Sequence, residues 1–226
     1  MMRSLLLLGL LSACSAVPQD LTGKVFTFPQ SSTSSYVRLT ASHTQFAKAT
    51  LCQRFMTDLR RDHGLFSLST RTFPNGLLIF WDEPNKEMEV HVRDKKAEYY
   101  KSDIKLNMWH SLCATWESSN GLVQLWIDGQ PSIRKYVAWG TNFTESQLII
   151  ILGQEQDSHG GSFDSKQCFI GMMADVHMWD YVLSPCEIQA YVDDRNFTPG
   201  NMLNWKALEF QIFDKVLIED KQMSCH

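Results

Sequence analysis

The sequence contains no run of five or six lysines and arginines, and its formal net charge is only −4 over 226 residues. This balance does not favour a nucleic-acid-binding protein. It has 12 glycines, 7 prolines and no internal repeats, which excludes collagen-like and linker sequence. The 44% apolar content, with 12% aromatic residues, excludes a disordered chain. The length suits one large β domain, or one to two average domains.

The one long apolar run lies at the N-terminus. Arg3 precedes Leu5–Leu11, and small residues follow that run. This order is typical of a cleaved secretory signal, and the run is roughly half the ~20 residues that a membrane-spanning helix needs. We predict a signal peptide over residues 1–16, cleaved after Ala16 or alternatively after Ala13. The remaining domain, residues 17–226, is expected to be secreted and to have no membrane span.

Two N-glycosylation sequons begin at Asn142 and Asn196. The first predicts a glycan on Asn142 and argues against a bacterial lipoprotein, which the LSAC segment near the N-terminus otherwise resembles. The second sequon is followed by Pro199, which usually lowers its use.

Five cysteines remain after the predicted cleavage: Cys52, Cys113, Cys168, Cys186 and Cys225. Export permits disulfides, and the odd number leaves at least one thiol free or paired between chains. Cys52 and Cys113 each lie in the middle of a predicted strand, which suits a buried bridge. Cys168 and Cys186 flank an extended segment that should hold them beyond bridging distance. Cys225 has three open alternatives: pairing within the chain, pairing with another subunit, or a free thiol.

Short alternating or apolar runs, separated by turn residues, dominate the rest of the chain. We predict strands at Lys24–Phe28, Tyr36–Leu39, Leu51–Met56, Leu65–Thr70, Leu77–Trp81, Glu87–Arg93, Ser111–Glu117, Leu122–Asp128, Gln147–Leu152 and Phe169–Trp179. Asn120-Gly121 and Asp128-Gly129 predict tight hairpins, so Leu112–Val137 should form a β-meander. Many short strands at this spacing indicate an all-β antiparallel sandwich or jelly roll. The tail after Val216 is expected to be peripheral.

One short helix is predicted at Ser184–Tyr191. Ser184 is a good N-cap, Pro185 suits the first helical position, and Glu187 completes a capping box. Cys186 then falls in the first turn, where the helix dipole lowers the pKa of a free thiol.

The segment with the most chemistry is residues 153–167, GQEQDSHGGSFDSKQ. It contains three carboxylates and three carboxamides: Glu155, Asp157, Asp164, Gln154, Gln156 and Gln167. Two glycines let the loop fold back, so it could offer the six to eight oxygen ligands that Ca²⁺ takes. A solvated acidic loop is the equally weighted alternative. The spacing is not that of an EF-hand.

This segment and several others resemble the pentraxin family. The matching stretches are KVFTFPQSSTSSYVRL, LLIFW, CATWESSNGLVQLWIDG, IILGQEQDSHGGSFDSKQ, VHMWDYVLSP and LNWKAL, which together cover nearly all of the predicted mature chain. The resemblance implies a two-sheet jelly roll that assembles into a cyclic, usually pentameric, ring. It also implies a Cys52–Cys113 disulfide and two calcium ions per subunit. The implied calcium ligands are Asn75, Glu155, Gln156 through its backbone carbonyl, Asp157, Asp164 and Gln167.

Two positions depart from the family pattern. Pro74 stands where the family usually has an aspartate ligand, so the first calcium site should be weakened unless a water, a carbonyl, Asp82 or Glu83 substitutes. Phe80 matches the aromatic ligand-binding position of phosphocholine-binding members. An ungapped alignment puts Lys95 at the acidic position beside it, where a cation would repel a quaternary ammonium. Calcium-bridged phosphate or carbohydrate groups should therefore bind better than choline.

Two other classes of protein compete with this interpretation. Jelly-roll glycoside hydrolases use E-x-D-x-x-E, but Glu155-x-Asp157 is followed by Gly160 at the closing position, so the general acid is missing. A passive adhesion module of the laminin-G type is the second. The histidine and cysteine spacings do not suit zinc.

We therefore expect a secreted, non-enzymatic, calcium-dependent pattern-recognition protein of innate immunity, similar to acute-phase pentraxins. Its expected ligands are phosphate, phosphocholine-like or carbohydrate groups on microbial or damaged-cell surfaces. Complement components are partners by resemblance only, and no nucleic-acid motif is present. A ring would add avidity for repeated surfaces, by a factor of ~10²–10⁴.

Overall fold

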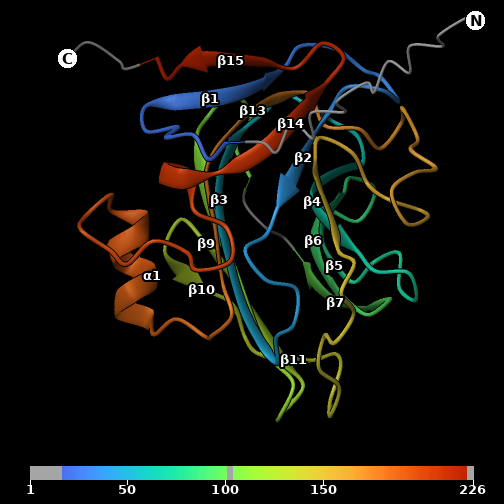
Figure 1. The fold of residues 1–226 in the computed structure, drawn as a ribbon, viewed down its shortest axis with the longest axis vertical. Helices are drawn as coiled ribbons and strands as arrows, with labels where there is room; N and C mark the ends of the chain where they lie inside the picture. Colours follow the sequence, from blue (N-terminus) through green and yellow to red (C-terminus); the bar gives the residue numbers. More distant parts are fainter. Residues whose placement is uncertain (1–16, 101–103, 223–226) are drawn as a thin grey trace, which may run out of the picture.

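Two antiparallel β-sheets packed face to face form the structure, a computed structural model that describes residues 17–100 and 104–222 (Figure 1). The first sheet has the order β10-β9-β8-β3-β13-β1-β15, with β11 also paired to β9. The second has the order β14-β2-β12-β4-β5-β6-β7. Neighbours in these orders are mostly distant in sequence, as expected for a jelly roll, so the predicted all-β, two-sheet fold class is confirmed.

The strands of the first sheet are β1 (Lys24–Phe28), β3 (Lys48–Met56), β8 (His110–Glu117), β9 (Leu122–Ile127), β10 (Gln130–Pro131), β11 (Lys135–Tyr136), β13 (Gly171–Trp179) and β15 (Leu217–Asp220). Those of the second are β2 (Tyr36–Thr40), β4 (His63–Ser69), β5 (Leu77–Asp82), β6 (Glu87–Val92), β7 (Lys95–Tyr100), β12 (Ile149–Leu152) and β14 (Glu209–Phe213). All ten predicted strands are present, with ends shifted by a few residues.

The C-terminal tail is peripheral, as predicted, but part of it is a strand. Leu217–Asp220 forms β15, which pairs with β1 at the edge of the first sheet. Its four residues are all exposed, so the segment carries no buried face that a sequence pattern could reveal. β7 and β14 were also missed. In β7 the charged residues Lys95, Lys96 and Glu98 conceal the inward residues Ala97 and Tyr99.

The core lies between the two sheets. Phe26 of β1 packs edge-on against Phe210 of β14 at 5.1 Å between ring centroids, and against Trp205 at 5.2 Å. Trp205 starts a short 3-10 helix, η1 (Trp205–Ala207), and donates its ring N–H to Leu21 at 2.7 Å. Burial of such large aromatic residues from both sheets stabilises the sandwich, at roughly 25 cal/mol per Å² of apolar surface.

The Cys52–Cys113 disulfide is present, as predicted. The two residues face each other directly on β3 and β8. Helix α1 (Pro185–Val192) covers this bridge on the outer side of the first sheet, where Ile188 and Tyr191 pack into the same buried cluster (Figure 1). Cys168 is buried and Cys186 is exposed, both as free thiols, whereas Cys225 lies outside the described residues.

The helix has the predicted start. Ser184 accepts a hydrogen bond from the Glu187 backbone N–H, and the Glu187 carboxylate accepts one from the Ser184 N–H at 2.7 Å. The hairpin predictions are also confirmed, since Gly121 and Gly129 have φ values of +69° and +79° at the two turns of the β8-β9-β10 meander. The predicted signal peptide, residues 1–16, lies outside the described part of the chain.

Candidate functional site

The acidic loop lies on the outer face of the second sheet, opposite the face of the molecule that carries α1 (Figure 1). A register shift in β4 between Gly64 and Phe66 changes which residues face outward. After this bulge Phe66 and Leu68 point into the core, while Ser67 and Ser69 contact the loop. Such a bulge re-aims side chains without ending the strand.

Two backbone contacts hold the loop in place. Phe169 donates its N–H to the Gly153 carbonyl at 3.0 Å and thereby closes the base of the loop. Gly64 of β4 donates to the Gln167 carbonyl, also at 3.0 Å. Gly153 has φ of +91° and lies against the Phe28 ring, so a side chain there would be both strained and blocked.

Gln156 fastens the middle of the loop to the sheet and is fully buried. Its amide nitrogen donates to the Ser67 carbonyl at 3.0 Å and to the Ile149 carbonyl at 3.1 Å. Its amide oxygen accepts from the Ser69 hydroxyl and the Gly160 N–H, both at 3.0 Å. Because these contacts use the side chain at both ends, only its backbone carbonyl is available as the predicted ligand.

Glu155 is a buried carboxylate that other carboxylates repel. It is 6% exposed, and its buried Oε2 has no hydrogen-bond partner. Burial, followed by repulsion from Asp157 and Asp164, raises the pKa of Glu155 from 4.5 to about 7. The structure therefore brings together three of the residues singled out from sequence. Asp157 and Asp164 are themselves exposed, so this group of carboxylates opens toward solvent.

Gln167 and Asp164 belong to one turn at the end of the loop. The Gln167 N–H donates to the Asp164 carbonyl at 2.9 Å, and the Lys166 N–H donates to the Asp164 carboxylate at 2.8 Å. This fixes the direction of the Asp164 side chain and leaves its second oxygen available. Gln167 is half-buried beside it.

Asn75 lies just before β5, and its buried Oδ1 has no hydrogen-bond partner. Among the described contacts, none joins Asn75 to the acidic loop. The Asp94 carboxylate accepts from the Asn75 N–H at 2.8 Å, while the Asp94 N–H donates to the Asn75 carbonyl at 3.0 Å. The expectation that Asp82 or Glu83 could replace a ligand at Pro74 is wrong, because both lie at the opposite end of β5.

A hard cation fits the residues of this loop. Oxygen is the ligand atom that calcium takes, and Glu155 of the loop has a buried oxygen without a donor. Asn75, which lies outside the loop, has another. Asp157 and Asp164 also act electrostatically on Glu155, so positive charge there would favour ionisation of all three. Burial and the repulsion of Asp157 and Asp164 raise the pKa of Glu155, and a cation held there would relieve that repulsion.

Phe80 lies on the same outer face as the loop, half-buried and outside the hydrophobic core. It pairs with Gly64 on one side and with Glu89 on the other. The register corrects the alignment made from sequence: Lys95 lies opposite Val92, a core residue, whereas Lys96 lies opposite His91 on the face that carries Phe80. Lys96 is therefore the lysine on the face of the sheet that carries Phe80.

Lys96 does not stand alone on this face. It forms ion pairs with Glu89 and with Glu98, the latter at 2.7 Å. Burial raises the pKa of Glu89, but hydrogen bonds from His91 and Lys96 outweigh this effect and lower it overall. Sequence analysis missed these residues, although the alternation of Glu87, Glu89 and His91 in β6 already placed them on one face.

The fold and the site together define a lectin-like β-sandwich with an acidic loop on one outer face. A family model described as the Pentaxin family matches residues 24–220. C-reactive protein of Sus scrofa is 41% identical over 219 residues, which cover 96% of both chains. Serum amyloid P-component of Cavia porcellus is 40% identical over 203 residues, 89% of each chain. The chain therefore belongs to the pentaxin, or pentraxin, family.

Solved structures agree on the fold. The native heptameric SAP-like pentraxin from Limulus polyphemus has a TM-score of 0.81 at 21% identity, covering 90% of this chain and 98% of that one. Domains LG4-5 of the mouse laminin α1 chain share the sandwich at a TM-score of 0.54 and 11% identity, covering 89% and 51%. These similarities concern the fold alone, so the laminin-G resemblance carries no function.

Family membership makes this chain a pattern-recognition pentraxin and not an enzyme. This decides against the glycoside hydrolase, for which the closing glutamate was already missing at Gly160. No helix among the described residues is long and apolar enough to cross a membrane.

Proposed function

We propose that this protein is secreted and uses calcium to recognise anionic or carbohydrate groups on microbial or damaged-cell surfaces. The observation that carries the proposal is the environment of Glu155. This buried carboxylate lies beside two others, has an oxygen without a donor, and belongs to a loop on an open face of the molecule. A structural acidic loop would not need to bury an unpaired carboxylate oxygen.

The residues that would hold calcium are those of the loop and the adjoining turn: Asn75, Glu155, the Gln156 carbonyl, Asp157, Asp164 and Gln167. Two ions per subunit are expected in this proposal, and Pro74 weakens the first site. Bound calcium would supply positive charge with coordination positions open to oxygens of a ligand. The side chain of Gln156 and the Gly64 contact keep the loop in register for this purpose.

The surface beside the loop favours phosphate or carbohydrate over choline. Phe80 offers an aromatic face, worth only about 0.5–2 kcal/mol toward a quaternary ammonium. Its neighbour Glu89 already pairs with Lys96 and with His91, the latter at 2.7 Å. The negative charge that would attract a choline group is thus largely neutralised within the protein.

The decisive experiment measures retention on a phosphomonoester resin in calcium and elution by EDTA. The double variant Glu155→Gln/Asp157→Asn should lose retention, whereas Glu219→Gln, an exposed carboxylate of β15, should retain it. A soluble phosphomonoester should compete, and free choline should not. Retention that persists in EDTA would contradict the proposal, and choline competing as well as phosphate would contradict the ligand class.

We also propose that the chain assembles into a cyclic homo-oligomer, expected to be a pentamer. Large apolar side chains at 64–72% exposure, Ile133 and Trp139, lie around β11 near Tyr136, which is 63% exposed. Burying them in a subunit interface would remove unfavourable apolar contact with water. Trp139→Glu should lower the mass measured by light scattering, while Val182→Glu, exposed at 39%, should not.

The proposed function also includes secretion and a glycan on Asn142. Residues 1–16 are proposed to be removed as a signal peptide, and residues 17–226 to form the secreted domain. Asn142 is exposed and uses its Oδ1, not the nitrogen that carries a glycan, to accept from Ser118 at 2.7 Å. Protein from a eukaryotic secretory host should lose mass on glycosidase treatment, and Asn142→Gln should abolish that shift. Complement partners rest on family resemblance.

A further inference from the structure

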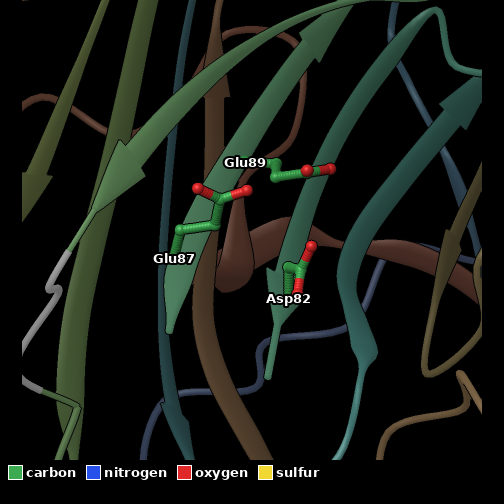
Figure 2. Close-up of side chains that lie close together, drawn as sticks. All are labelled: Asp82, Glu87 and Glu89. Carbon is green, nitrogen blue, oxygen red and sulfur yellow. The ribbon is translucent and has the colours of Figure 1, made fainter. Parts of the chain in front are cut away.

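A second group of carboxylates lies on the outer face of the second sheet, separate from the acidic loop. Asp82 of β5 and Glu87 and Glu89 of β6 each offer an oxygen atom, and these three atoms lie within 4.8 Å of one another. Figure 2 shows the three side chains converging on the same side of β5 and β6. Asp82 and Glu87 are direct cross-strand partners, and Glu89 follows on the same face.

Glu87 is the member of this group with a buried carboxylate oxygen that no donor reaches. It is only 1% exposed, and its buried Oε2 has no hydrogen-bond partner. Burial, followed by repulsion from Glu98, Glu89 and Asp82, raises its pKa. Like charges facing each other across a strand pair destabilise a sheet, so this pairing is costly as it stands.

The neighbouring hydrogen-bond donors and cations pair with Asp82 and Glu89. The Asp82 carboxylate accepts from the Asn85 N–H at 3.1 Å and from the Asn85 amide at 3.0 Å. Glu89 pairs with Lys96 and His91. Lys96 also forms an ion pair with Glu98.

Nearby Lys86 does not add positive charge to this group of carboxylates, because it pairs with Glu83. Lys96 is therefore the one described lysine that pairs with this face, against the four carboxylates of Asp82, Glu87, Glu89 and Glu98.

We propose that Asp82, Glu87 and Glu89 form a further calcium site, distinct from the site of the acidic loop. Three carboxylates converging at one side of a sheet, one of them buried with a free oxygen, provide the oxygen ligands that this ion prefers. With few protein ligands and water completing the shell, the affinity belongs to the weak range of extracellular modules, about 10⁻⁴–10⁻³ M. Binding there stabilises the β5-β6 hairpin.

The site can be measured once the loop is removed from the titration. In the Glu155→Gln/Asp157→Asn background, calorimetric titration with calcium should still detect one weak ion. Adding Glu87→Gln, which keeps the size of the side chain, should weaken that binding by at least about tenfold. Adding Glu98→Gln instead, which removes a neighbouring charge but no proposed ligand, should leave a detectable site. Lys96→Gln should tighten it, since a competing cation is gone.

Hydrogen exchange gives a second readout. Calcium should slow exchange of the amides in residues 87–92 in the loop-deficient background, and Glu87→Gln should abolish this effect. Absence of binding in that background, or equal binding with and without Glu87, would overturn the proposal. Tighter binding of zinc than of calcium would also overturn it, since it would assign the site to the His91–Glu89 pair. None of these outcomes bears on the acidic loop, which is tested separately in the unmodified background.

Discussion

The Cβ atom of Glu155 lies 3.1 Å from the position that a Cβ atom would take on Gly64. The backbone of Gly64 has no positive φ, so the absence of a side chain serves this close approach and not a special conformation. The strand-to-loop contact that orients Glu155 therefore depends on a residue outside the acidic loop.

Gly64→Val should push Glu155 away from β4 and weaken calcium binding by about tenfold or more, with a loss of roughly 1–3 kcal/mol in stability from overpacking. Gly64→Ala should have a smaller effect. Calcium titration and thermal unfolding measure the two quantities. Gly161→Ala is the matched control, because the nearest atom to its added Cβ is the Ser158 hydroxyl at an ordinary 3.5 Å. Equal effects at both glycines would contradict this account.

Stability without calcium should depend on pH through Glu155. Its pKa rises from 4.5 to about 7 on folding, so between these values the folded chain holds a proton that the unfolded chain has lost. The folded state is therefore penalised as pH rises through this window, by about 3 kcal/mol at pH 8, given ~1.4 kcal/mol per pKa unit.

Urea unfolding in EDTA at several pH values measures this dependence. Glu155→Gln should flatten the profile between pH 4.5 and 7, because the amide does not ionise, whereas Glu219→Gln should leave it unchanged. Parallel profiles for Glu155→Gln and the unmodified chain would show that another group titrates.

Pro74→Asp should tighten the weaker calcium site, since it adds a carboxylate next to Asn75, whose buried Oδ1 has no donor. We expect a gain of about tenfold, in line with the effect of ligand charge on calcium affinity. Calorimetry measures it, with Pro29→Asp, an exposed proline outside the site, as the control. Unchanged affinity would indicate that Asp94 or solvent already fills the position.

Calcium removal should loosen the loop. Without a cation, repulsion among Glu155, Asp157 and Asp164 favours opening, so residues 158–166 should become accessible to proteases in EDTA. Mass spectrometry of limited digests locates the cleavage. Identical digestion patterns with and without calcium would argue that the hydrogen bonds of Gln156 alone hold the loop.

Removing the disulfide should reduce stability without affecting calcium binding. Cys52→Ala/Cys113→Ala opens a loop of 61 residues and should cost about 2–4 kcal/mol of unfolding free energy. The bridge lies under α1 on the opposite sheet from the acidic loop, so the calcium affinity of the folded variant should not change. Cys186→Ala, an exposed free thiol, should be neutral in denaturant titrations.

The candidate site divides into residues that sequence could find and residues that it could not. Glu155, Asp157 and Asp164 lie within ten positions of one another, so their proximity follows from a short loop. Gly64 and Ser67 are about ninety positions away, and nothing local marks them as the support of that loop. Lys96 was misassigned as Lys95, since one residue in a hairpin moves a side chain to the other face of a strand.

Local chemistry in the sequence was sufficient for ten of the strands, the two glycine turns, the capped helix and the acidic loop, because each depends on residues close together in the chain. Tertiary structure alone decided which residues contact each other across the sheet. It placed the bulge in β4, the close approach of Glu155 to Gly64, and the pairing of Asp82 with Glu87. The approach of Gly64 to Glu155 joins segments about ninety positions apart. The bulge and the Asp82–Glu87 pair depend on the register of neighbouring strands, which side-chain alternation constrains but does not fix.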